Sequence, residues 1–173
     1  MRSTRRVVTG HDGAGKAIVA FDGPAPNAKL RNASGLVSTL LWVTDESPAD
    51  VSGSLDAAQR EIGVAPPPAG TIFRVVDFPP TAGQFSSEAV LKEMGLAADA
   101  GGRHPLMHRT ASIDYAVVLE GEIDMLLDDS EVHLRAGDVL VQQATNHAWV
   151  NRGSQPCRIA FVLVGSTIFS DGA

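Results

Sequence analysis

Two histidines and an aspartate in the second half of the chain are side chains of the kinds found in metal and acid–base sites. His108 precedes an apolar run, Asp114 lies within it, and His147 begins a later run. Two imidazoles and a carboxylate can hold Fe(II), or zinc with an open position. A buried carboxyl with a raised pKa can instead exchange protons with a substrate. We therefore take His108, Asp114 and His147 as candidate metal ligands, and Asp114 and His147 as candidate catalytic residues.

Each of these residues also has a purely structural interpretation. Asp114 sits among apolar neighbours, and a buried carboxylate without a partner is costly, so its alternative is pairing with Arg109, Thr110 or Arg74. The alternative for His147 is a core imidazole that donates to a backbone carbonyl, and for His108 a loop residue without a task.

Further side chains are candidates for lining the same pocket. Trp149 and Asn151 follow His147 at alternating positions, so on a strand they share its face. Gln143 lies on the opposite face from Gln142, and the turn after them decides which one reaches the pocket. The pocket candidates are His104, Thr110, Gln143, Trp149 and Asn151.

Short apolar runs separated by turn residues predict an all-β fold. The chain has 173 residues, and its 17 glycines and 10 prolines fall between these runs. One helix is expected over residues 86–94, with Gly95 suited to end it. The expected strands are residues 5–9, 16–21, 38–44, 71–78, 113–119, 122–127, 132–135, 139–143, 147–151 and 158–164.

Two segments of the second half resemble the signature motifs of the cupin superfamily. The first is His108-Arg109-Thr110, three residues, Asp114, six residues and Gly121, and the second is Gly137-Asp138 followed by His147, three residues and Asn151. The resemblance implies a cupin double-stranded β-helix, a jelly-roll barrel, with N-terminal extra strands and one short helix. Residues 1–70 would form a β arm and surface excursion that pack on the barrel or on a partner subunit, and residues 71–173 the barrel.

The resemblance also implies a function, with two departures from the pattern. Thr110 stands where cupins have a second histidine, and Asp114 where they have glutamate. The implied cofactor is a divalent metal ion (Fe, Mn, Zn or Ni), or none. The residues in and around the two motifs also resemble those of a bacterial and fungal subgroup of cupins linked to polyketide or aromatic metabolism. We expect a metal-dependent decarboxylase or dioxygenase-like enzyme that acts on a small oxygenated acid or enol. The alternative is a non-catalytic cupin that binds a small ligand without metal.

Charge and composition exclude several partners. The net charge is −6 and the sequence carries no basic stripe, so we expect no nucleic acid partner. Apolar runs fall far short of the roughly 18 residues of a membrane span, no signal peptide is recognisable, and the only cysteine is Cys157, so we expect a cytoplasmic protein. Strands that are apolar on both faces need a second covering layer, which the N-terminal strands or a partner subunit would supply. Because the resemblance to cupins of this size also implies pairing, we expect a homodimer with strand exchange.

Overall fold

The computed structural model describes residues 3–81, 87–96 and 102–167. The all-β class is confirmed, and within these ranges no helix is long and apolar enough to cross a membrane. The predicted helix is present from Ser87 to Met94, and residue 86, its predicted first residue, lies outside the described residues. The elements are β1 (Arg5–His11), β2 (Ala17–Pro24), β3 (Asn27–Leu30), β4 (Val37–Thr44), β5 (Thr71–Phe78), α1 (Ser87–Met94), β6 (Ser112–Glu120), β7 (Glu122–Leu126), β8 (Glu131–Arg135), β9 (Val139–Gln143), β10 (Ala148–Val150) and β11 (Cys157–Gly165).

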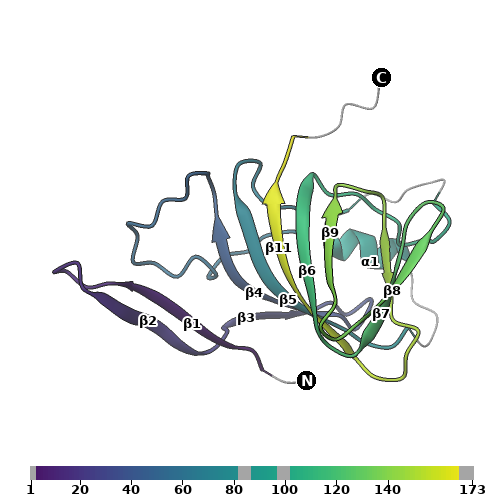
Figure 1. Cartoon of the computed structure of the whole chain (residues 1–173), viewed down its shortest axis with the longest axis horizontal. Helices are drawn as coiled ribbons and strands as arrows, with labels where there is room; N and C mark the ends of the chain where they lie inside the picture. Colours follow the sequence, from purple (N-terminus) through teal and green to yellow (C-terminus); the bar gives the residue numbers. More distant parts are fainter. Residues whose placement is uncertain (1–2, 82–86, 97–101, 168–173) are drawn as a thin grey trace.

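Two antiparallel sheets form the barrel, and a hairpin projects from it (Figure 1). The larger sheet has the strand order β3-β4-β5-β11-β6-β9, and the smaller one has the order β10-β7-β8. Strands β1 and β2 pair only with each other. This arrangement is the jelly-roll, or double-stranded β-helix, architecture that the sequence predicted.

Alternation along the strands decides which side chains enter the barrel. On β6, Asp114, Ala116 and Val118 are buried, whereas Tyr115, Val117 and Leu119 are exposed. The inward side chains join a core supplied by both sheets, because an apolar face gains free energy when it is removed from water. Its fully buried members include Ile72, Ile123 and Ile159.

Glycine is required at the turn between β6 and β7. Gly121 has a φ of 77°, and a Cβ there would lie 2.6 Å from the Pro156 carbonyl oxygen. Any side chain would therefore collide with backbone as well as strain the turn. Gly95 ends α1 with a φ of 71°, as expected, and the following Leu96 N–H donates to the Leu91 carbonyl.

The N-terminal segment contributes directly to the larger sheet. β4 pairs with β5, and β3, a short strand that the sequence analysis did not predict, pairs with β4. The hairpin β1–β2 is anchored at its base, where the buried Arg6 guanidinium donates to both carboxylate oxygens of Asp56 at 2.7 and 2.5 Å. Residues 27–44 thus belong to the barrel wall, and the hairpin extends from it.

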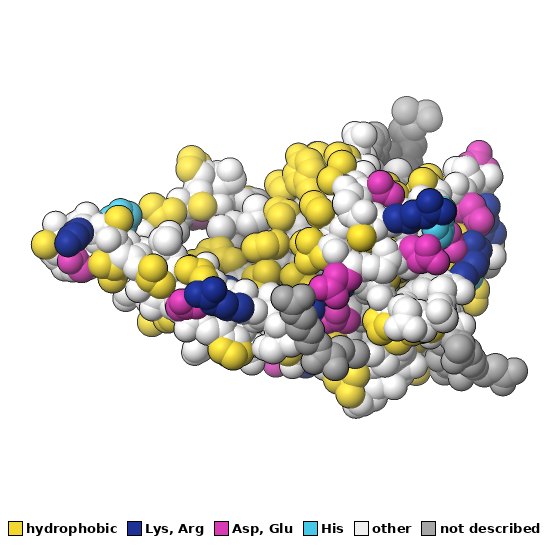
Figure 2. All heavy atoms as spheres, turned by 60° about the horizontal axis from the view of Figure 1, so that its bottom comes forward, with side chains coloured by type: hydrophobic (Ala, Val, Ile, Leu, Met, Phe, Trp, Pro, Cys, Tyr) yellow, Lys and Arg dark blue, Asp and Glu magenta, His cyan; other side chains and the backbone are white. Residues whose placement is uncertain are grey.

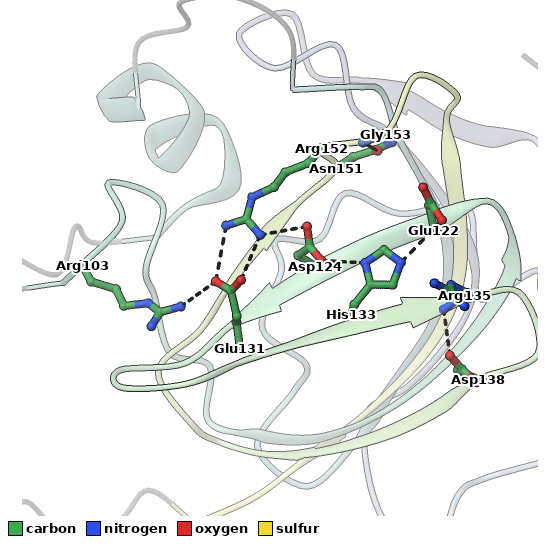
Figure 3. Close-up of polar contacts among 10 residues, drawn as sticks. All are labelled: Arg103, Glu122, Asp124, Glu131, His133, Arg135, Asp138, Asn151, Arg152 and Gly153. Atoms are coloured by element: carbon green, nitrogen blue, oxygen red, sulfur yellow. Dashed lines mark hydrogen bonds and ion pairs between the residues drawn. The ribbon is translucent and has the colours of Figure 1, made fainter.

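The outer face of β7 and β8 carries a connected polar network (Figure 3). Arg152 donates to both Asp124 and Glu131, and Arg103 donates to Glu131 from the other side. The Nδ1 atom of His133 lies 2.7 Å from an Asp124 oxygen. His133 is solvent-exposed and does not line the cavity described below.

The outer face of the larger sheet is apolar and lacks a covering layer among the described residues. Figure 2 shows hydrophobic side chains gathered on the molecular surface between the projecting hairpin and the barrel. The hairpin exposes Val7 and Val19 as well. A two-stranded hairpin has little stability by itself. The exposed large apolar residues of β5, β6 and β9 are Phe73, Tyr115, Val117, Leu119, Val139 and Val141.

We predict that a second copy of the chain covers this face, giving a homodimer. The double substitution Val139→Lys and Val141→Lys places charges on the edge strand β9 and should yield monomers, because a buried ammonium group is costly. The matched control is Val51→Lys, in the segment between β4 and β5, where the residue is 84% exposed; this variant should stay dimeric. Light scattering coupled to size-exclusion chromatography measures the masses. A wild-type mass of one 18.1 kDa chain would contradict the prediction.

Candidate functional site

A cavity inside the barrel brings together the motif residues from both segments. It encloses about 600 Å³ of space, part of which is open to solvent. Its walls are mainly apolar, and a few polar groups converge on it, as in most small-molecule sites. The apolar lining is Leu36, Val64, Val76, Phe78, Met94, Trp149, Phe161 and Leu163. The polar lining is Arg31, Ser38, Arg74, His108, Thr110, Asp114 and His147.

The two histidines are held together by their backbones. His108 N–H donates to the His147 carbonyl and His147 N–H to the His108 carbonyl, each at 3.0 Å. The ring centroids are 4.5 Å apart. The Nδ1 atom of each ring lies beside the carbonyl oxygen two residues earlier: Leu106 at 2.9 Å for His108, and Thr145 at 3.0 Å for His147. Donation from Nδ1–H to these carbonyls leaves each Nε2 as an acceptor.

Burial keeps both imidazoles neutral. Burial and, to a smaller extent, the neighbouring His108 together lower the pKa of His147 to about 4, against the opposing effect of the Thr145 carbonyl. Burial also lowers the pKa of His108, against the opposing effect of the Leu106 carbonyl. A neutral imidazole with Nδ1 protonated presents a free Nε2 lone pair, which can accept a proton or a hydrogen bond.

Asp114 projects from β6 into the same cavity. Burial raises the pKa of its carboxyl to about 6, while the Ser112 hydroxyl, which donates to Oδ1 at 2.5 Å, and the Arg74 charge both oppose the rise. Of the structural partners considered from the sequence, Arg74 acts on Asp114 only through its charge. The strand pairing explains this: Arg74 lies opposite Phe161 on β11, and Asp114 lies opposite Leu163, so one strand separates them.

The turn between β9 and β10 decides which glutamine approaches the histidines. Gln142 is buried, and its Nε2 donates to the Thr145 carbonyl at 2.9 Å and lies 3.2 Å from Nδ1 of His147. Gln143, the pocket candidate, is exposed on the other face and does not line the cavity. Ala144 adopts a left-handed conformation with a φ of 51° in this turn. Sequence alternation alone left this choice open.

The other pocket candidates divide between the cavity and its supports. Thr110 and Trp149 line the cavity. Asn151 does not, because its amide donates to the Phe78 and Gln155 carbonyls and joins the ends of β5 and β11. His104 does not line it either, and its Nδ1 accepts from the Leu106 N–H at 3.2 Å. Ser112 was missed although strand alternation places it on the same face as Asp114, two residues away. Arg31 was missed because only the folded chain brings it to the cavity that Arg74 lines.

The donor set does not fit the metal centre that the resemblance implied. In the described part of the chain, no group of three or more His, Cys, Asp or Glu side chains is arranged to hold a metal ion. The two Nε2 atoms suit a metal, but the Asp114 carboxyl, one methylene shorter than glutamate, is engaged by Ser112. Thr110 supplies a hydroxyl where a third imidazole would stand. Catalytic zinc sites use three protein ligands, and only two imidazoles are paired here.

Comparisons with known proteins agree with this architecture. The family model described as "Cupin domain" matches residues 95–164. Phomopsin biosynthesis cluster protein C′ of Diaporthe leptostromiformis is 34% identical over 160 residues, which cover 88% of this chain and 72% of that protein. The cupin-domain-containing oxidoreductase fogC of Aspergillus ruber is 31% identical over 92% of this chain and 71% of its own length.

The likeness to solved structures is weaker than the likeness in sequence. The cupin domain of Cnp3 from Schizosaccharomyces pombe is 10% identical, with a TM-score of 0.49 over 95% of this chain and 90% of that one. The stronger evidence is sequence similarity, because the relatives exceed 30% identity over more than two thirds of their own length. The match of the family model spans both motifs and all three candidate residues. This chain therefore belongs to the cupin superfamily.

Proposed function

We propose that this chain is an enzyme of small-molecule biosynthesis that moves protons on a small, oxygenated and largely apolar compound. The observation that carries the proposal is a buried carboxyl, Asp114, in one apolar cavity with two neutral imidazoles, His108 and His147. Relatives named as biosynthesis cluster proteins and as oxidoreductases support an enzymatic role in secondary metabolism.

The residues support a keto–enol isomerisation. The ionised Asp114 takes a proton from the carbon beside a carbonyl, and the electron pair of that C–H bond forms the double bond of the enol. The proton then returns to the carbonyl oxygen, so the step needs no oxidant or reductant. A carboxyl with a pKa of about 6 suits a general base near neutral pH. His147 orients a substrate hydroxyl, because its Nε2 can accept a hydrogen bond.

A metal-dependent decarboxylation or dioxygenation is the second candidate. The observation that favours it is that both rings have Nδ1 beside a backbone carbonyl, which is the usual arrangement of metal-bound histidines. This candidate function requires a third metal ligand beside the two imidazoles. A non-catalytic cupin that binds a small ligand remains the alternative to any enzyme.

Proton exchange tests the enzymatic proposal. Incubation of phenylacetone with the protein in D₂O, followed by proton NMR, measures exchange at the benzylic carbon. We expect Asp114→Asn to lower the protein-dependent rate by about 100-fold or more, since a positioned general base contributes at least that factor. The wild-type rate should rise with pH through about 6, because the ionised Asp114 is the base. Asp129→Asn, at an exposed turn, is the control. Exchange no faster than in buffer would favour the ligand-binding alternative.

Asp114 should also make stability depend on pH. Its folded pKa of about 6 lies above the ordinary 3.8, so its contribution to stability is present below pH 3.8 and is lost as pH rises through 6. We expect Asp114→Asn to gain about 2 kcal/mol in unfolding free energy, relative to wild type, between pH 4 and pH 8. Urea unfolding at both pH values measures this difference. An equal difference at the two pH values would contradict the assigned burial.

Metal content distinguishes the first two candidates. After loading with Zn²⁺ and desalting, we expect wild type to retain far less than one equivalent by mass spectrometry. Thr110→His should retain close to one, because a third imidazole would join the pair lining the cavity. Ser54→His, at an exposed position, is the control. Stoichiometric metal in wild type that is lost in His147→Ala would overturn the metal-free proposal and favour the decarboxylase or dioxygenase.

A further inference from the structure

Two arginines line the cavity together with Asp114 and the histidines. Arg74 projects inward from β5, between the apolar Ile72 and Val76 on the same face. Arg31 reaches the cavity from the turn between β3 and β4. Neither is part of the cupin motifs, and neither has a role in the proton transfer proposed above. Guanidinium groups in a mainly apolar cavity wall are costly unless a group of opposite charge pairs with them.

Arg74 is buried without an adjacent carboxylate in the described chain. Arg74 is 6% exposed. Its Nη2 donates to the Gly63 carbonyl at 2.7 Å and more weakly to the Val64 carbonyl at 3.4 Å. Its Nε is buried and has no hydrogen-bond partner among the described residues. Carbonyl oxygens do not neutralise a guanidinium charge, so an unpaired donor and a net charge remain inside the barrel.

Arg31 adds a second positive charge to the same wall. Its Nη1 donates to the Glu93 carbonyl at 2.6 Å, at the C-terminal end of α1, which fixes the guanidinium beside the cavity. Burial and, to a smaller extent, the charge of Arg31 together lower the pKa of Arg74 to about 10, while Asp114 partly compensates. Two like charges face one carboxyl that Ser112 already engages, so the wall is positive.

We propose that Arg31 and Arg74 bind a carboxylate group of the ligand, whose apolar body fills the rest of the cavity. The inference rests on the proposed function and names its substrate class, an apolar carboxylic acid. A guanidinium matches the planar geometry of a carboxylate, and Arg74 has more donors than partners, since its Nε has none among the described residues. Trp149, Phe161 and Leu163 form the apolar wall against which the rest of the ligand packs.

A matched pair of probes tests the charge requirement. Isothermal titration calorimetry compares 2-naphthoate with 2-naphthamide, which has nearly the same shape but no charge. We expect wild type to prefer the acid by about 10-fold to 100-fold, the usual effect of hydrogen bonds to a charged group. The preference should fall below about 3-fold in Arg31→Gln and in Arg74→Met, with binding of the amide unchanged. Arg60→Gln, which removes an exposed arginine paired with Asp45, should keep it.

The outcomes separate this site from the proton-transfer proposal. Arg31→Gln decides the matter if the buried Arg74 variant fails to fold, because Arg31 is only partly buried. Equal binding of acid and amide, a preference that survives both substitutions, or no saturable binding of either probe would overturn the inference. An arginine-dependent preference without Asp114-dependent exchange would overturn the isomerase and leave the carboxylate site standing.

Discussion

The pairing of strand β11 with its two neighbours is the interaction on which the rest of the structure depends. This strand pairs with β5 on one side and β6 on the other, in the middle of the larger sheet. The pairing satisfies the backbone groups of all three strands in the interior, and it sets the register of Arg74 relative to Asp114. Because side chains alternate, this one register sends both charged groups into the cavity and leaves the opposite, apolar faces outside.

The barrel interior holds charge at a cost in stability that its packing must offset. Asp114 and Arg74 are each nearly removed from solvent, and burial shifts the pKa of each toward its neutral form. A hydrophobic replacement at either position would fit the core better on physical grounds alone. Groups of this kind at the wall of a cavity are typical of functional sites, where stability is given up for chemistry.

The histidine pair is held in place by the backbone of the barrel. The reciprocal backbone hydrogen bonds between His108 and His147 keep the imidazoles adjacent. The carbonyls of Leu106 and Thr145 set the same tautomer in both rings. Thr110 and Asp114 stand at the other two ligand positions of the cupin motif, and among the described residues no group of three or more His, Cys, Asp or Glu is placed to hold a metal ion. In the proposed function the two imidazoles therefore act as neutral hydrogen-bond acceptors.

The sequence by itself determined the strand pattern and the buried position of Asp114, because alternation and turn residues act locally, and its resemblance to the cupin motifs implied the barrel. The spacing of the motifs likewise placed His108 and His147 in one cavity. Only the tertiary structure decided that Gln142 rather than Gln143 approaches His147, that Asn151 joins strand ends, and that Arg31 reaches Arg74. These outcomes depend on turn conformation and on contacts between residues far apart in the chain, which one-dimensional periodicity does not encode.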